Sequence, residues 1–145
     1  MSKTEEKGEE EMKRVILTIS ALLIVFIAIM CVLLCFQPRV EFDNKNTGTT
    51  NFTYRDKEIK SNISSEHLEQ IVSMFENKKM KTDSPSCGFT KDVSIEIDNK
   101  TFCIACDTCG KVYLFEEDKY FSLDEEENES LRNILECYGF EFPCI

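Results

Sequence analysis

VILTISALLIVFIAIMCVLLCF, residues 15–36, is an apolar stretch of 22 residues that contains no charged residue, proline or glycine. At about 1.5 Å per residue, a helix of this length spans roughly 33 Å, enough to cross a hydrocarbon core of about 30 Å. Fifteen of the residues are Ile, Leu, Val or Phe, whose favourable insertion outweighs the small cost of Thr18 and Ser20. The stretch therefore predicts a single transmembrane helix.

The same stretch differs from a cleaved signal sequence. The apolar part of a signal peptide has about 7–15 residues and precedes a cleavage site of small residues. This stretch is longer and continues into LLCFQP, residues 33–38, which lacks a small-x-small site. A lipoprotein signal needs a small residue before its cysteine, but large apolar residues precede Cys31 and Cys35. We therefore expect residues 15–36 to remain in the protein as an anchor.

Basic residues at the ends of the anchor predict its orientation, because Lys and Arg beside a span resist translocation. Lys13 and Arg14 adjoin the apolar stretch on its N-terminal side, whereas only Arg39 and Lys45 lie close on the other side. The expected topology is a single pass through the cell membrane. Residues 1–14 form a cytoplasmic tail, and the C-terminal domain lies outside.

The chain is polar on both sides of the anchor. Residues 1–12 are charged, show no apolar periodicity and are predicted to be disordered. Residues 37–51 are rich in turn-forming residues and predict a tether, which leaves residues 52–145 for one small extracytoplasmic domain. From Gln37 onward, 13 Lys and Arg face 22 Asp and Glu, a net charge of −9. This balance argues against nucleic acid as a partner, because its phosphates require a basic surface.

Two stretches of the predicted domain have helical periodicity. The first begins at Ser64, and its apolar residues follow i, i+3, i+4, i+7 spacing. These residues are Leu68, Ile71, Val72 and Phe75. In the second, Ser122 and Glu125 have the spacing of a capping box, and Gly139 suits the C′ position. Its apolar stripe consists of Leu131, Ile134, Leu135 and Tyr138.

Shorter stretches predict strands: 52–59 at an edge, then 93–97, 101–106, 112–115 and 120–122. In the clearest one, Val93, Ile95 and Ile97 alternate with polar residues, as in a half-buried strand that ends in a turn at 98–100. Residues 140–145 are expected to pack back on the domain. The predicted fold class is α+β. It comprises one transmembrane helix and a small domain with an antiparallel meander of three to five strands and two helices on one face.

The predicted domain contains six cysteines, and an even number in a small extracytoplasmic domain indicates disulfide bonds. They are Cys87, Cys103, Cys106, Cys109, Cys137 and Cys144. If Cys103 and Cys106 share a strand, their side chains point to opposite faces, so we do not expect them to pair with each other. More suitable partners are Cys87, Cys137 and Cys144. Fifteen pairings are possible, and the sequence does not choose among them.

A metal or redox centre at Cys106 and Cys109 is the alternative. CDTCGK, residues 106–111, is similar to one knuckle of a zinc ribbon, but a second knuckle is missing because six residues separate Cys137 from Cys144. The spacing of Cys103, Cys106 and Cys109 is also similar to the start of an iron–sulfur motif, whose fourth cysteine is replaced by Tyr113. A thioredoxin-like pair would need a helix N-terminus after it, and none is evident. We therefore favour structural disulfides.

Catalytic constellations are not evident in the sequence. His67 is the single histidine, lies in the first turn of a predicted helix and has no nearby partner in sequence, so we expect an exposed polar residue rather than a base. The chain has no phosphate-binding glycine loop, and its acidic residues are explained as helix starts. We predict a protein that is not an enzyme and binds no cofactor.

Three segments carry a resemblance to a known group of proteins: KTFCIACDTCG at 100–110, YFSLDEEE at 120–127 and YGFEFPC at 138–144. They resemble small, uncharacterised membrane-anchored or lipoprotein-type extracytoplasmic proteins of clostridial Gram-positive bacteria. The resemblance implies an extracytoplasmic domain and assigns no catalytic residue. The predicted role is non-enzymatic, either binding a protein partner at the cell surface or serving as a structural or accessory part of the envelope. A redox or zinc protein is the alternative.

Overall fold

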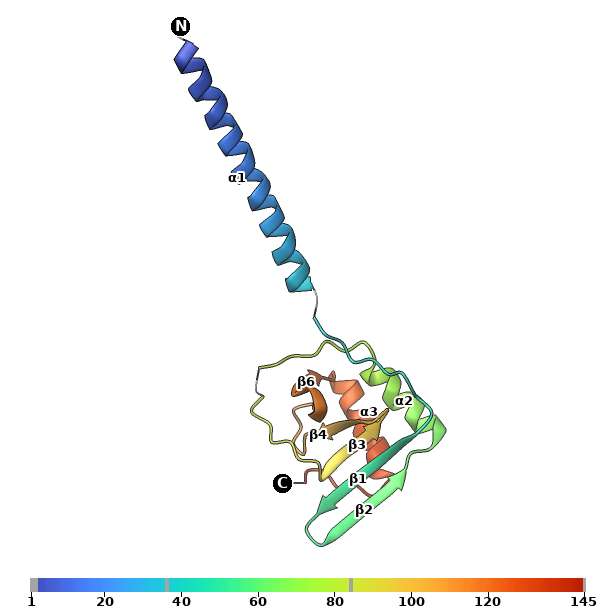
Figure 1. Ribbon diagram of the computed structural model, residues 1–145. Coiled ribbons are helices and arrows are strands. Elements are labelled where there is room, and N and C mark those ends of the chain that lie inside the picture. Colours follow the sequence, from blue (N-terminus) through green and yellow to red (C-terminus); the bar gives the residue numbers. More distant parts are fainter. Residues whose placement is uncertain (1–2, 36, 84, 145) are drawn as a thin grey trace. The chain divides into compact units, whose positions relative to one another are not determined.

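The structure is a computed structural model that describes residues 3–35, 37–83 and 85–144 (Figure 1). The chain divides into two compact units, Met1–Gln37 and Pro38–Ile145. The first unit consists of one helix, and the second contains the sheet and the other helices.

Helix α1 spans Lys3–Cys35 without interruption. Its segment Met12–Leu33 is long and apolar enough to cross a membrane, and none of it is buried. Phe36, the last residue of the predicted anchor, lies outside the described residues. The prediction of disorder is wrong for Lys3–Met12, which are helical. Glu and Lys are good helix formers, and the adjoining apolar helix removes the cost of nucleation.

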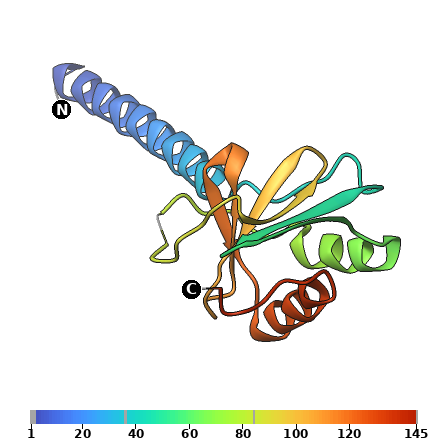
Figure 2. The same ribbon diagram turned by 90° about the horizontal axis from the view of Figure 1, so that it is seen from below.

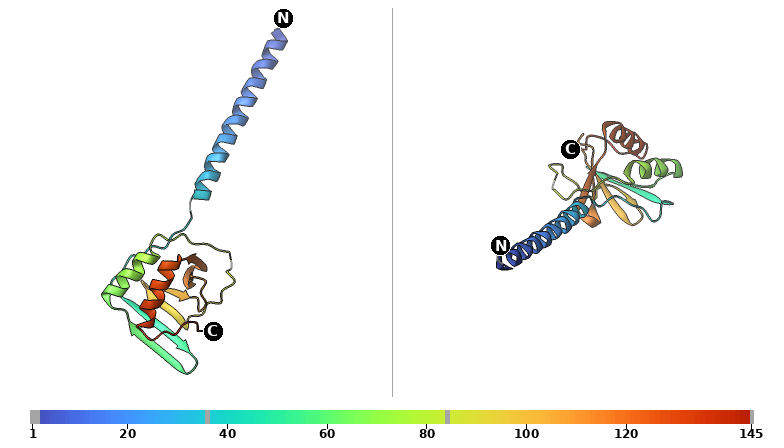
Figure 3. Two further views of the ribbon diagram at one scale, coloured as in Figure 1. Left: turned by 180° about the vertical axis from the view of Figure 1, so that it is seen from behind. Right: turned by 90° about the horizontal axis from the view of Figure 1, so that it is seen from above.

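The second unit is built on a six-stranded sheet in the order β2-β1-β3-β4-β5-β6, and all neighbours are antiparallel. The strands are β1 Gly48–Tyr54, β2 Lys57–Asn62, β3 Val93–Ile97, β4 Lys100–Ile104, β5 Lys111–Leu114 and β6 Lys119–Ser122. Helices α2, Ser65–Phe75, and α3, Glu125–Glu136, lie on one face of the sheet (Figures 2 and 3). The predicted α+β architecture is confirmed, with one strand more than expected.

The extra strand comes from the segment predicted as a single edge strand at 52–59. It forms a hairpin instead, because Arg55 and Asp56 make a two-residue turn between β1 and β2. The turn was missed because it contains neither Gly nor Asn, which mark most short hairpins. A second two-residue turn, at Asp98 and Asn99, lies where a turn is predicted, and both residues have positive φ, 55° and 58°.

The predicted tether at 37–51 is part of the folded unit. Val40 is 1% exposed and Phe42 is also buried. The backbone N–H of Val40 donates to Lys78 O at 3.0 Å, and the N–H of Met80 donates to Pro38 O at 2.9 Å. Two apolar residues among polar ones are too short a pattern for a sequence argument to detect. The domain therefore begins at Pro38 rather than at residue 52.

Capping hydrogen bonds determine where helices α2 and α3 begin and where α3 ends. Ser64 caps α2 as predicted, because its Oγ accepts from the N–H of His67. The capping box of α3 is formed by Asp124 and Glu127 rather than by the predicted Ser122 and Glu125, since Ser122 is still paired in β6. At the other end of α3, Gly139 has a φ of 88°. The N–H groups of Gly139 and Phe140 donate to Glu136 O and Leu135 O. This is the Schellman motif expected of a C′ glycine.

The core lies between the sheet and the two helices. Phe52, Phe75, Phe102 and Phe121 are fully buried there, and Phe75 contacts the rings of both Phe102 and Phe121. The apolar stripes predicted for the helices are buried, except that Tyr138 is half-buried. Phe140 of the C-terminal tail stacks on Phe52 with ring centroids 4.6 Å apart. The described part of the tail, residues 140–144, thus packs back on the domain as predicted.

The two edges of the sheet are protected differently. At the β6 edge, Lys81 and Tyr120 exchange two backbone hydrogen bonds of 2.8 and 3.0 Å. At the other edge, no strand among the described residues pairs with the outer side of β2, which carries the charged side chains of Lys57, Glu58 and Lys60. Charged side chains discourage another strand from pairing with an open edge.

Candidate functional site

Four of the six predicted disulfide cysteines are paired, as Cys106–Cys144 and Cys87–Cys109. Cys106 reaches one of the three partners expected for it. The prediction that all six would pair is wrong for Cys103 and Cys137, which are free. The structure does not bring Cys106 and Cys109 together as one metal or redox centre, the alternative predicted from the sequence. Each of the two sulfurs is instead bonded to a different cysteine.

The Cys106–Cys144 bond joins the C-terminal tail to the β4–β5 turn, residues 105–110. Its Cα atoms are 5.0 Å apart, and Cys144 is 8% exposed. Arg132 of α3 supports the same place, since its guanidinium lies 4.6 Å from the centre of the Phe142 ring and donates to the backbone oxygen of Asp107. One cysteine of this pair, Cys144, is thus buried and the other, Cys106, is half-buried.

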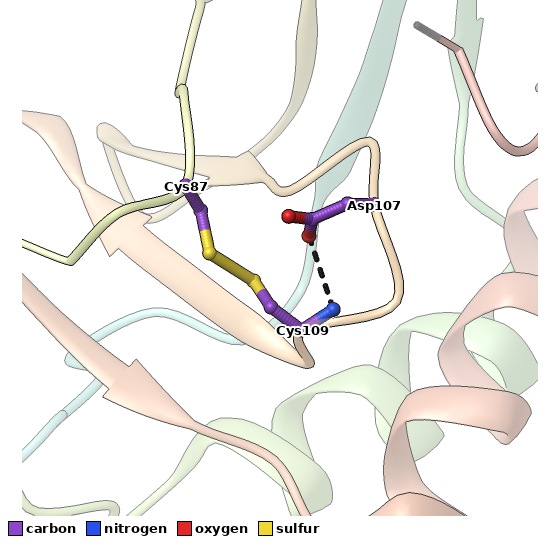
Figure 4. A group of neighbouring side chains, drawn as sticks. All are labelled: Cys87, Asp107 and Cys109. Atoms are coloured by element: carbon purple, nitrogen blue, oxygen red, sulfur yellow. Dashed lines mark hydrogen bonds between the residues drawn. A yellow bond between two sulfur atoms is a disulfide. The ribbon is translucent and has the colours of Figure 1, made fainter.

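The second pair lies beside a carboxylate (Figure 4). Cys87 belongs to the covering loop, residues 85–92, whereas Asp107 and Cys109 belong to the β4–β5 turn. One ligand atom from each of the three residues lies within 4.8 Å of the others, and all three residues are half-buried. Asp107 Oδ1 accepts from the N–H of Cys109 at 3.0 Å, which fixes the carboxylate beside the sulfurs.

The β4–β5 turn needs a glycine at its end. Gly110 has a φ of 63°, a conformation that other residues seldom adopt. Its carbonyl accepts from the N–H of Leu123 at 2.8 Å, and a Cβ added there would lie 3.3 Å from the Leu123 carbonyl oxygen. Gly110 therefore positions Asp107 and Cys109 and ties the turn to the end of β6.

The covering loop crosses the face of the sheet opposite the helices. Its Phe89 stacks on Tyr113 of β5 with centroids 5.3 Å apart. The backbone oxygen of Lys91 accepts from Asn51 Nδ2 at 2.9 Å and from Ser94 Oγ at 2.7 Å. These side chains of β1, β3 and β5 hold the loop that carries Cys87.

Cys103 lies on this second face of the sheet and is 1% exposed. Burial raises the pKa of its thiol to about 11, and the carboxylate of Glu116 adds to the increase. The thiol therefore remains protonated at neutral pH and is a poor nucleophile. Cys137, in contrast, is exposed just beyond the end of α3.

His67 is half-buried and has a partner, which corrects the expectation of an exposed side chain. Its Nδ1 lies 2.9 Å from the hydroxyl oxygen of Tyr138, and the rings meet edge to face. The same hydroxyl accepts from the N–H of Ser64 at 2.9 Å and donates to Ser64 Oγ. The group joins the start of α2 to the chain after α3, a contact invisible to sequence reasoning because 71 positions separate His67 from Tyr138.

A polar cavity of about 380 Å³ lies at the end of β1, β3 and β4 and is lined by Thr47, Thr49, Glu96, Asp98 and Thr101, among others. Its acidic groups already have partners. Thr49 Oγ1 donates to Glu96 at 3.3 Å, and the N–H of Asp43 donates to Asp98 at 2.7 Å. The cavity is open and polar, and its hydrogen bonds stabilise the adjoining strand ends.

Comparison of the chain with known protein families, with curated proteins and with solved structures gave no match.

Proposed function

We propose that the protein is a single-pass membrane protein whose domain, residues 38–145, acts outside the cytosol as a non-enzymatic binding or accessory domain of the cell envelope. The observation that carries the proposal is the Cys106–Cys144 disulfide, in which Cys144 is buried, in a small domain that follows an apolar helix. Disulfides persist in oxidising compartments and are rare in the cytosol. A stable disulfide therefore favours the side of the membrane away from the cytosol.

Charge and resemblance support the same placement. Lys13 and Arg14 adjoin the N-terminal end of the apolar segment, so this end is expected to stay in the cytoplasm. The net charge of −9 after the anchor disfavours nucleic acid and anionic lipid surfaces as partners. The resemblance to clostridial extracytoplasmic proteins implies the same location.

The side chains that could take part in catalysis, among those that the structure describes, are buried or hydrogen-bonded within the domain, which supports a binding role. The thiol of Cys103 is buried, and its raised pKa keeps it protonated. His67 is engaged by Tyr138, and Glu96 and Asp98 accept hydrogen bonds at strand ends. These groups stabilise the fold, and the exposed surface of the domain is left for a protein partner.

Cys137 allows a direct test of the topology, because it is exposed and free. In a chain whose other candidate thiols are removed by Cys31→Ala and Cys35→Ala, a membrane-impermeant maleimide added to intact cells should label the protein, and the further change Cys137→Ser should abolish the labelling. Protease added to the same cells should remove a C-terminal tag and leave the N-terminus intact. Labelling that requires permeabilised cells would place the domain in the cytosol and overturn the proposal.

Chemical crosslinking on intact cells then tests the binding role. A partner should be captured by the full-length protein and lost when the domain is released by protease. Recovery of the full-length protein without a crosslinked protein would contradict partner binding and leave the accessory role.

A further inference from the structure

We propose that Cys87, Asp107 and Cys109 form a binding site for a zinc-type divalent metal ion when the Cys87–Cys109 bond is reduced. The inference goes beyond the proposed function and is independent of it, since it concerns one corner of the domain and not the side of the membrane.

The three side chains supply a suitable set of ligands. Thiolates select zinc and related soft ions, and a carboxylate is an accepted additional ligand. With bonds of about 2.3 Å to sulfur and about 2.0 Å to oxygen, a tetrahedral ion keeps its ligand atoms roughly 3.5–3.8 Å apart. The three ligand atoms already lie within 4.8 Å of one another. After reduction, the sulfur atoms need only separate by rotation of the side chains to reach this arrangement.

The backbone spacing distinguishes this pair from the other one. The Cα atoms of Cys87 and Cys109 are 7.2 Å apart, whereas those of Cys106 and Cys144 are 5.0 Å apart. Disulfides usually join Cα atoms separated by about 4.4–6.8 Å. At this wider spacing, two thiolates can bind a shared ion that lies between them. The covering loop then need not move closer to the β4–β5 turn when the ion binds.

The position of Asp107 also favours an ion. Its carboxylate extends from the β4–β5 turn toward the two sulfurs (Figure 4), and its Oδ1 is fixed by the N–H of Cys109. A disulfide offers a carboxylate no charge to neutralise, whereas a divalent ion does. Two thiolates, the carboxylate and the ion sum to a charge of −1, and the guanidinium of Arg132 is bound to the backbone oxygen of Asp107. A positively charged group is thus already bound to the residue that would supply the carboxylate ligand.

The three candidate ligands are accessible to solvent. The fold of the turn does not depend on the Cys87–Cys109 bond alone. Cys87, Asp107 and Cys109 are each partly exposed, and all lie outside the strands. Cys106–Cys144 fastens the other side of the same turn. Three protein ligands leave a fourth position, which water or an exogenous ligand fills in three-ligand zinc sites.

The change between the two states balances as follows. A dithiol reductant gives two electrons and two protons to the Cys87–Cys109 bond and becomes a disulfide itself, so that two thiols form. Binding of the ion then displaces both thiol protons. Metal affinity is therefore expected to rise with pH, as it does for other thiolate sites.

The test uses the full-length protein in detergent, reduced with a dithiol, freed of excess reductant and titrated with Co²⁺. One ion per chain should bind and produce thiolate-to-cobalt absorption, while the oxidised protein should give no signal. The double variant Cys87→Ser, Cys109→Ser should lose the signal. Asp107→Asn should weaken binding by about tenfold or more, because the amide oxygen can still accept from Cys109 but carries no charge. The matched control Cys137→Ser should bind as the wild type does.

Alkylation after addition of Zn²⁺ identifies the ligands independently of absorption and of the proper folding of a variant. Zinc should protect Cys87 and Cys109 from iodoacetamide and leave Cys137 reactive. Failure of zinc to protect Cys87 and Cys109, binding that persists in the double variant, or an Asp107→Asn variant with unchanged affinity would each overturn the proposal. Absence of binding to the reduced wild-type protein would do the same.

Discussion

The two cysteine pairs fasten different segments to the same β4–β5 turn, and they differ in what surrounds them. Cys106–Cys144 closes a separation of 38 residues and Cys87–Cys109 one of 22. In the chain-entropy model this difference is worth only about 0.5 kcal/mol. The larger contrast is in packing: Cys144 belongs to the same buried core cluster as Phe140, whereas Cys106, Cys87 and Cys109 are all partly exposed. Packing, rather than loop length, should separate a structural bond from an exchangeable one.

The largest effect is expected at the buried tail. Phe140→Ala removes a ring that is 3% exposed and stacked on Phe52, so the free energy of unfolding should fall by about 3–5 kcal/mol. Phe89→Ala, which removes a half-buried ring from the covering loop, is the matched control and should cost less. Urea unfolding of the full-length protein in detergent measures both. Equal losses would show that the two segments are packed alike.

A second test removes each disulfide in turn. From the logarithm of the loop lengths, Cys144→Ser should destabilise the domain by about 4 kcal/mol and Cys87→Ser by about 3.5 kcal/mol. The Cys144 variant should also become sensitive to protease at the tail, because Phe140 and Phe142 lose their attachment to the turn. If Cys87→Ser proved the more damaging change, the covering loop rather than the tail would be the structural element.

The smallest effect is expected in the pH dependence of the free energy of unfolding. It depends on Cys103, which lies on the face of the sheet that the covering loop crosses. The Cys103 thiol has a pKa of about 11 in the folded protein against 9.0 for an unperturbed thiol. Between these values the folded state binds more protons than the unfolded state, so stability is complete below pH 9 and falls as the pH rises toward 11. Between pH 8 and pH 10.5 the loss should be about 2 kcal/mol.

Urea unfolding at pH 8 and pH 10.5 measures this loss, and Cys103→Ala separates it from the titration of other groups. The alanine variant should show a shallower decline with pH than the wild type. Matching declines would mean that the thiol is accessible to water and that the loop does not cover it.

Sequence reasoning succeeded where the relevant neighbours are close along the chain. The spacing of Leu68 and Ile71 identified α2, the alternation of Val93 and Ile95 identified β3, and Gly139 was recognised as a helix-terminating residue. Each of these patterns depends on the periodicity or backbone preference of a few adjacent residues. The apolar part of helix α1 is detectable for the same reason.

Features that depend on distant contacts were missed or left open. The sequence of residues 37–51 does not indicate that Val40 and Phe42 are part of the core, because the residues that they pack against come from other parts of the chain. The pairing of Cys106 with Cys144 depends on the path that the C-terminal tail takes after α3. The candidate metal site had one local signal, the cysteines on either side of Asp107 in CDTCG, but its third ligand, Cys87, lies 22 positions before Cys109.

The protected sheet edges bear on how the domain behaves when many copies are concentrated together. An open strand edge can template a strand of another molecule and begin an aggregate. Here the β6 edge is occupied by Lys81, and the β2 edge presents Lys57, Glu58 and Lys60. A second molecule would have to displace the segment at Lys81 to add at the β6 edge, and would have to accommodate a row of charged side chains to add at the β2 edge. The domain is thereby guarded against the strand-to-strand association by which small β-rich proteins precipitate.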